Sequence, residues 1–116
     1  MKITLDKTKT IELHDLPKVS LNELFARKHW RERKKLNDTF ALLVRSQIKE
    51  IIDYPCDVEY EFWFKSRPLD CSNCAAMVKM IEDTIFPTDS NKIVRSIKIT
   101  SLKRKDDVVF IKIIKA

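Results

Sequence analysis

Apolar and polar residues alternate along residues 57–64, which predicts a strand with one buried face. The residues that share the apolar face are Val58, Tyr60, Phe62 and Phe64. Residues 93–101 and 108–114 predict two more strands, joined by a basic turn at residues 103–106. A further strand or a loose hairpin is expected near the N-terminus, where short segments contain Ile3, Leu5, Ile11 and Leu13.

A helical period follows between residue 20 and about residue 53. Ser20 and Glu23 have the spacing of a capping box, Pro55 is expected to end the segment, and a break near residues 37–38 would divide it into two helices. Its apolar residues, at intervals of three and four, are Leu36, Phe40, Leu43, Val44, Ile48 and Ile51. A second helix is expected over residues 72–86, with a buried stripe of Cys74, Met77, Ile81 and Ile85.

These elements predict an α+β fold in which one mixed sheet carries two main helices packed over it. A chain of 116 residues fits one domain. Because no internal repeat, low-complexity segment or long linker divides the chain, residues 1–116 are expected to form that single domain.

Composition narrows the classes of function. The chain has no glycine, whereas average usage would give roughly eight. Walker loops and dinucleotide-binding fingerprints need glycine beside phosphate, so we expect no nucleotide cofactor. The 23 Lys and Arg residues against 17 Asp and Glu give a net charge of +6 and a pI near 9.3, which favours a polyanionic partner.

The sequence also predicts the cellular location of the protein. No apolar run approaches the roughly 20 residues of a membrane helix, and the first residues lack the apolar core of a signal peptide. Three cysteines are too few for a disulfide scaffold. We therefore expect a cytoplasmic protein without membrane contact.

A basic run lies between residues 27 and 35, with a single acid, Glu32. Such a surface can neutralise phosphates with a salt-dependent affinity, and Trp30 within it can stack on an exposed base. The same run is also typical of an ordinary solvated helix in which Trp30 lies partly in the core. The cations are Arg27, Lys28, Arg31, Arg33, Lys34 and Lys35.

Asp70 stands between a predicted strand and a predicted helix. Its carboxylate can cap the helix by accepting hydrogen bonds from free N–H groups, or it can hold Mg²⁺, which prefers oxygen ligands. A polar line on that helix lies apart from the apolar stripe and consists of Ser72, Ala76, Lys79 and Asp83. Lys79 and Asp83 have the spacing of an ordinary surface ion pair as well.

Asp89 lies in the polar loop of residues 87–91. Such loop residues normally form local turns. If the next strand pairs beside the strand of residues 57–64, Asp89 would return towards Asp70, and the two carboxylates would share a cation.

Cysteine and histidine chemistry is less favoured. Cys71 and Cys74 form a Cys-x-x-Cys spacing, but the remaining Cys56, His14 and His29 are not at zinc-finger spacing. Cys74 belongs to the apolar stripe, so packing explains it better than a metal or redox role. No serine is marked out as a nucleophile.

The order of short motifs resembles the RusA family of Holliday-junction resolvases over most of the chain, from about residue 13 to residue 114. The matching features are a Leu-Pro segment followed by Ser20-Leu21-Asn22, a basic helix, Leu69-Asp70-x-x-Asn73, Lys79 with Asp83, and Asp89 before two closing strands. The family pattern is Asp-x-Asp-Asn at the helix start, where this chain has Ser72 in place of the second aspartate. A lysine usual one turn beyond the asparagine is Ala76 here, and the loop has one acid, Asp89.

The resemblance implies a dimeric, Mg²⁺-dependent endonuclease, with Mn²⁺ as a substitute ion, that nicks four-way DNA junctions in pairs. It implies Asp70 and Asp89 as metal ligands, Lys79 as the cation that stabilises transition-state charge, and Asp83 as a group that positions Lys79 or joins the metal shell. Asn73 and Ser72 would orient water. The residues expected to bind the DNA backbone are Arg27, Lys28, Arg31, Arg33, Lys34, Lys65, Arg67, Lys103 and Arg104.

Two other functions fit the sequence. Since Ser72 removes a charge from a site of few ligands, the chain can be a branched-DNA-binding protein without catalysis. A small RNA-binding or scaffold protein would show no preference for junctions over duplex.

Overall fold

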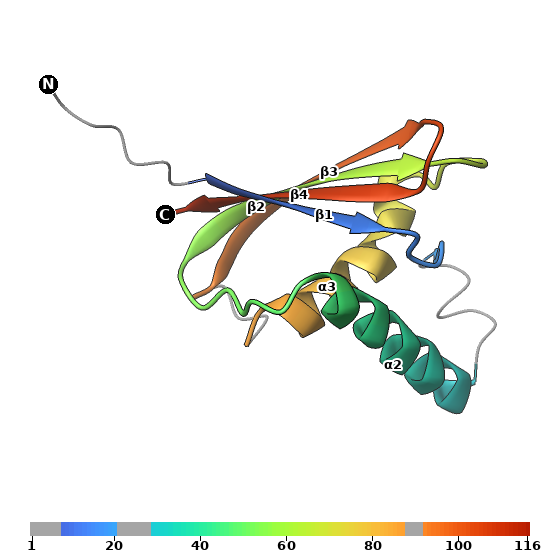
Figure 1. Ribbon diagram of the computed structural model, residues 1–116, viewed down its shortest axis with the longest axis horizontal. Coiled ribbons are helices and arrows are strands. Elements are labelled where there is room, and N and C mark those ends of the chain that lie inside the picture. Colours follow the sequence, from blue (N-terminus) through green and yellow to red (C-terminus); the bar gives the residue numbers. More distant parts are fainter. Residues whose placement is uncertain (1–7, 21–28, 88–91) are drawn as a thin grey trace, which may run out of the picture.

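The computed structural model describes residues 8–20, 29–87 and 92–116. Within these ranges a four-stranded sheet carries two helices on one face, and its other face is uncovered (Figure 1). The expected α+β fold is confirmed. The elements in chain order are β1 (Thr8–His14), α2 (Trp30–Gln47), β2 (Cys56–Phe64), the 3₁₀ turn η1 (Cys71–Cys74), α3 (Ala75–Ile85), β3 (Val94–Lys103) and β4 (Val108–Lys115).

The strand order is β1-β4-β2-β3. β2 and β3 are parallel, with Phe64 opposite Lys103, and the other two neighbouring pairs are antiparallel. The two closing strands are therefore not neighbours, because they flank β2. Their basic connection crosses the end of β2, where the N–H of Arg104 donates to the carbonyl of Phe64 at 3.0 Å.

The core lies between the sheet and the helices. The alternation predicted for β2 is confirmed, since Val58, Tyr60, Phe62 and Phe64 are each at most 3% exposed. On β1, Ile11 and Leu13 are buried as expected. Ile3 and Leu5 lie outside the described residues.

The helix expected from residue 20 to residue 53 is shorter than predicted. α2 continues past residues 37–38 without a break, but it ends at Gln47, and Ile48 is extended with φ −140° and ψ 130°. Ile48 and Ile52 are still buried, because the chain after α2 runs along the core and the N–H of Ile52 donates to the carbonyl of Ile85 at 2.8 Å. The predicted stripe was therefore wrong at its end, since Ile51, which it included, is 51% exposed, and the neighbouring Ile52 is buried instead.

At its other end α2 begins after His29, which is extended and accepts a hydrogen bond from the N–H of Arg31 at 3.2 Å. The expected helix is thus interrupted at His29. Residues 21–28 lie outside the described residues, so the capping box of Ser20 and Glu23 stays a prediction.

α3 is more deeply buried than an amphipathic helix. The predicted stripe is buried, but Ala76, Val78, Met80 and Thr84 are buried as well. The expected polar line is therefore broken at Ala76, which is 2% exposed. No helix in the described part of the chain is both long enough and apolar enough to cross a membrane.

Candidate functional site

An open cleft of about 300 Å³ lies where the carboxyl ends of the parallel strands β2 and β3 meet. We call it the Asp70 cleft. Two of the predicted site residues, Asp70 and Asn73, line it together with the predicted DNA-binding residue Arg67. The described residues that line the cleft are Lys18, Ser20, Arg67, Pro68, Leu69, Asp70 and Asn73.

Backbone hydrogen bonds of residues 69–74 fix the position of Asp70 just before the N-terminus of α3. The carbonyl of Asp70 accepts hydrogen bonds from the N–H groups of Asn73 at 2.9 Å and Cys74 at 3.1 Å. The preceding carbonyl, of Leu69, accepts one from the hydroxyl of Ser101 on β3 at 2.5 Å. The position of Asp70 is therefore set by its main chain and by the neighbouring strand.

The carboxylate of Asp70 does not cap the helix. Asp70 is the residue that precedes the 3₁₀ turn, yet its side chain makes no cap hydrogen bond, and it is exposed. Of the two roles open at the sequence level, capping is excluded. An exposed carboxylate beside the amide of Asn73 offers hard oxygen donors, which suit Mg²⁺.

A segment distant in sequence forms the other wall of the cleft. The ammonium of Lys18 donates to the carbonyl of Arg67 at 2.8 Å and to the hydroxyl of Ser66 at 3.2 Å. Sequence reasoning assigned no role to Lys18, and it treated Ser20 as a helix cap and as part of the family resemblance, not as a residue of the site. They were missed because about 50 residues separate them from Asp70, and only the tertiary structure brings the two segments together.

Other predicted catalytic residues lie outside the lining of this cleft. Ser72 is exposed on the 3₁₀ turn. Lys79 and Asp83 form an exposed ion pair on α3, with 3.4 Å between Nζ and Oδ1. Asp89 lies outside the described residues.

The condition for Asp89 to return towards Asp70 is met in one respect, since β3 pairs directly with β2. The pairing is parallel, so α3 carries the chain from the carboxyl end of β2 to the amino end of β3. Pro87 and Lys92, which flank the Asp89 loop, lie near the amino end of β3, whereas Asp70 lies near the carboxyl end of β2. Within residues 8–20, 29–87 and 92–116, no three His, Cys, Asp or Glu side chains gather as a ligand set.

Basic residues gather at the same end of the sheet as the cleft. Lys65 and Arg67 follow β2, and Lys103 and Arg104 end β3 or follow it. The guanidinium of Arg104 lies 5.8 Å from the ring centroid of Trp63. The loop after β2 is tied to the loop before β4, because the N–H of Lys65 donates to Oδ1 of Asp107 at 2.8 Å.

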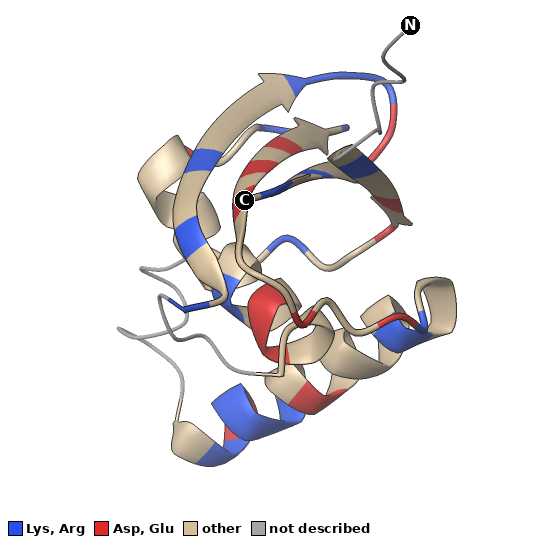
Figure 2. Cartoon of the chain, turned by 90° about the vertical axis from the view of Figure 1, so that its left-hand side faces the viewer, with Lys and Arg blue, Asp and Glu red and all other residues tan. Residues whose placement is uncertain are grey.

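The described part of the basic run lies in the first turns of α2, in the helix layer of the molecule (Figure 2). Trp30 is 55% exposed rather than part of the core, and the guanidinium of Arg31 lies 5.3 Å from its ring centroid. Lys34 forms an exposed ion pair with Asp38 at 3.0 Å, and Arg33 is half-buried. Arg27 and Lys28 lie outside the described residues.

The three cysteines are free thiols. Cys74 is fully buried, as its place in the apolar stripe predicts, and burial raises the pKa of its thiol to about 11. A high pKa opposes the thiolate that redox and zinc chemistry require. Cys71, in contrast, is exposed beside the cleft.

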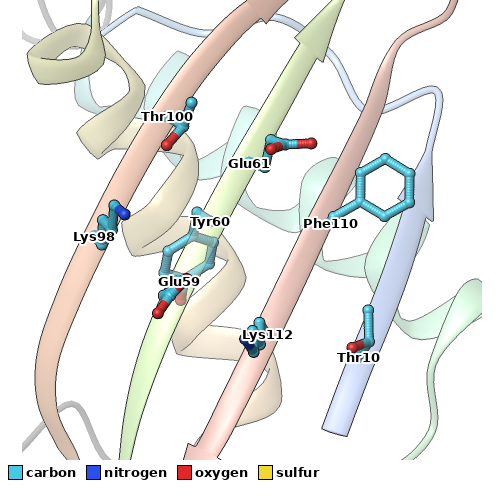
Figure 3. Close-up of a pocket in the computed structure, with 8 residues that line it drawn as sticks. All are labelled: Thr10, Glu59, Tyr60, Glu61, Lys98, Thr100, Phe110 and Lys112. Atoms are coloured by element: carbon cyan, nitrogen blue, oxygen red, sulfur yellow. The ribbon is translucent and has the colours of Figure 1, made fainter. Parts of the chain in front are cut away.

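A second pocket, of about 280 Å³, lies on the uncovered face of the sheet (Figure 3). At its centre Glu59 on β2 stands between Lys98 on β3 and Lys112 on β4, its register neighbours. Glu61 and Asp57 continue the acidic column along β2. Carboxylates in the middle of the face oppose the approach of phosphates, so this pocket is a poor match for nucleic acid.

Comparison of the chain with protein-family models and with curated proteins finds no match. The functional argument therefore rests on the residues of the cleft and on the motifs in the sequence.

Proposed function

We propose that the protein is a Mg²⁺-dependent endonuclease that acts on branched DNA, as its resemblance to the RusA family implies. One observation carries the proposal. The uncapped carboxylate of Asp70 and the amide of Asn73 line a single cleft with the two cations Lys18 and Arg67. A divalent ion and a phosphodiester require such a combination of oxygen donors and positive charges.

The carboxylate of Asp70 and the amide of Asn73 offer oxygen donors of the kind that a magnesium ion prefers. Asp70 would hold the ion, and Asn73 and Ser72 would orient water beside it. The resemblance assigns Asp89 as the second ligand, whereas Pro87 and Lys92, which flank its loop, lie near the amino end of β3, at the other end of α3 from Asp70. When bound, the ion supplies Lewis acidity that polarises the scissile phosphate. Asp83, paired with Lys79, would position the lysine that the resemblance implies for transition-state charge.

The substrate would lie across the basic end of the molecule. Lys65, Arg67, Lys103 and Arg104 would bind DNA backbone near the cleft, and the α2 surface with Arg31, Arg33 and Lys34, extended by Arg27 and Lys28, would bind a second part of the duplex. The cytoplasmic location expected from the sequence is compatible with a DNA substrate.

Paired nicks in a four-way junction require two sites related by two-fold symmetry, which a homodimer supplies. We therefore propose that the active species is a homodimer. Sedimentation equilibrium of the purified chain, alone and with junction, measures this directly.

The test is incubation of the full chain with a labelled synthetic four-way junction, with and without Mg²⁺. We expect symmetric nicks that require the ion and that fall at least 1,000-fold in Asp70→Asn, as expected when an essential charged group is lost. Asp53→Asn, an exposed aspartate in the chain between α2 and β2, is the matched control and should nick at the wild-type rate.

A second candidate function is junction binding without catalysis. It is favoured by Ser72 in place of the family's second aspartate and by the single carboxylate, Asp70, among the described residues that line the cleft. Salt-sensitive junction binding by the wild type without nicks, in either Mg²⁺ or Mn²⁺, would support this function and reject the nuclease.

A further inference from the structure

We propose that Lys18 is the phosphate-binding cation of the Asp70 cleft, a role that the sequence motifs assign to Lys79. The inference rests on the proposed function for its ligand, a DNA phosphodiester. It concerns a residue whose neighbours in sequence gave no indication of the role.

The structure holds Lys18 in position before any ligand binds. Leu16 and Val19, on either side of it, are 7% and 3% exposed and anchor this segment in the core. Its ammonium donates to the carbonyl of Arg67 and the hydroxyl of Ser66. An ammonium has three N–H donors, so these two bonds orient the group and leave one donor for a phosphate oxygen.

The charges of the cleft favour a phosphate next to Lys18. Asp70 alone would repel a phosphodiester, and its charge is opposed by the two cations Lys18 and Arg67 in the same lining. Arg67 uses its main-chain carbonyl to hold Lys18 and keeps its guanidinium for other contacts. The hydrogen bond from Lys18 to the carbonyl of Arg67 therefore joins the two segments that carry the cations of the cleft.

Lys79 is less suited to the role. Its ammonium pairs with Asp83, and it is not among the described residues that line the cleft. It lies six positions beyond Asn73, more than one and a half helical turns along the chain, and is exposed with Asp83 on the surface of α3. Ala76, one turn beyond Asn73, is buried and uncharged. α3 therefore brings no cation to the cleft, and the segment after β1 does.

The test compares Lys18→Gln, Lys18→Arg and Lys79→Gln in the full chain, with Lys49→Gln as an exposed control outside the site. We expect Lys18→Gln to slow Mg²⁺-dependent nicking at least 30-fold, Lys79→Gln to slow it less, and Lys18→Arg to recover most of the rate. Junction affinity measured at several salt concentrations should show a slope smaller by about one for Lys18→Gln alone.

The outcomes separate the inference from the proposed function. If the wild type binds junctions without nicks, the nuclease fails, and the salt slope still decides the role of Lys18. A wild-type salt slope in Lys18→Gln, or a greater loss of nicking in Lys79→Gln, would overturn the inference. Failure of the wild type to bind junctions would overturn both.

Discussion

At the scale of single residues, the different exposure of Asp70 and Cys74 indicates that Asp70 is available for a ligand and that Cys74 serves packing. Both lie at the start of α3, four positions apart. Asp70 keeps its carboxylate exposed and unused by the helix, whereas Cys74 is fully buried beneath the carbonyl of Leu69. An exposed carboxylate that makes no hydrogen bond to the helix is available for a ligand, and a buried thiol contributes to stability.

The burial of Cys74 predicts how stability depends on pH. Because the pKa of this thiol rises from 9.0 to about 11 in the folded state, its favourable contribution is complete below pH 9 and is lost as the pH rises towards 11. We expect the free energy of unfolding to fall across that window, and to fall less in Cys74→Ala, by on the order of 1 kcal/mol. Urea unfolding at pH 7, 9 and 10.5 measures the difference.

Cys71→Ala is the matched control, since Cys71 is exposed on the same turn. It should follow the wild-type pH dependence. Identical pH dependence in Cys74→Ala and the wild type would contradict the role assigned to burial.

At the scale of elements, the side chain of Gln47 attaches the end of α2 to the edge strand β1. The amide of Gln47 accepts a hydrogen bond from the N–H of His14 at 2.5 Å and donates one to the carbonyl of His14 at 2.8 Å. It thus bonds to the last residue of β1 as a neighbouring strand would. The segment that supplies Lys18 to the cleft begins immediately after His14.

Removal of this amide should weaken the attachment. We expect Gln47→Ala to lower the free energy of unfolding by about 1–2 kcal/mol, because two hydrogen bonds at about 1 kcal/mol each are lost from a partly exposed site. Lys49→Ala, two residues further on and exposed, should change it by less than about 0.5 kcal/mol. Equal stability of the two variants in urea unfolding would show that the helix end does not depend on Gln47.

At the scale of the whole molecule, charge is divided between the end of the sheet and its uncovered face. Lys65, Arg67, Lys103 and Arg104 lie at the end with the cleft, while the lysines of the uncovered face alternate with the acidic column of β2. The net charge of +6 does not reveal this division. The division predicts which lysines bind DNA.

Two double variants test this division, and each of them removes two positive charges. We expect Lys65→Gln with Lys103→Gln to weaken junction binding and to reduce the slope of log affinity against log salt by about two, one for each lost phosphate contact. Lys98→Gln with Lys112→Gln, beside Glu59, should leave both quantities near wild type. Similar losses in the two variants would indicate that binding depends on net charge alone.

Much of the fold could be predicted from the sequence, because strand alternation is a local property. The inward face of β2 and the apolar stripe of α3 follow from periods of two and 3.6 residues. Prediction failed where a residue's burial came from a distant partner. Ile48 and Ile51 have helical spacing, yet the chain beyond Gln47 is not helical, so Ile51 is exposed and Ile52, whose N–H bonds to Ile85 of α3, is buried in its place.

The candidate site could be predicted in part. Asp70, Asn73 and Arg67 were found because they are close in sequence, at a strand-to-helix junction where functional residues concentrate. Lys18 could not be found in this way, since neither a hydrophobic period nor any of the matching motifs includes it, and about 50 positions separate it from Asp70. The prediction that Ala76 belongs to an exposed polar line was wrong. Helical spacing tells which residues share a face of the helix, but not which part of the protein packs against that face.

By itself, the sequence determined the fold class, the inward face of β2, the apolar stripe of α3 and the chemical class of the candidate residues, since these depend on composition and local spacing. Tertiary structure alone decided the parallel pairing of β2 with β3, which gathers two basic loops at one end. It also decided that Lys18 joins Asp70 in one cleft. Both depend on contacts between segments distant in the chain, which packing of the shared core selects.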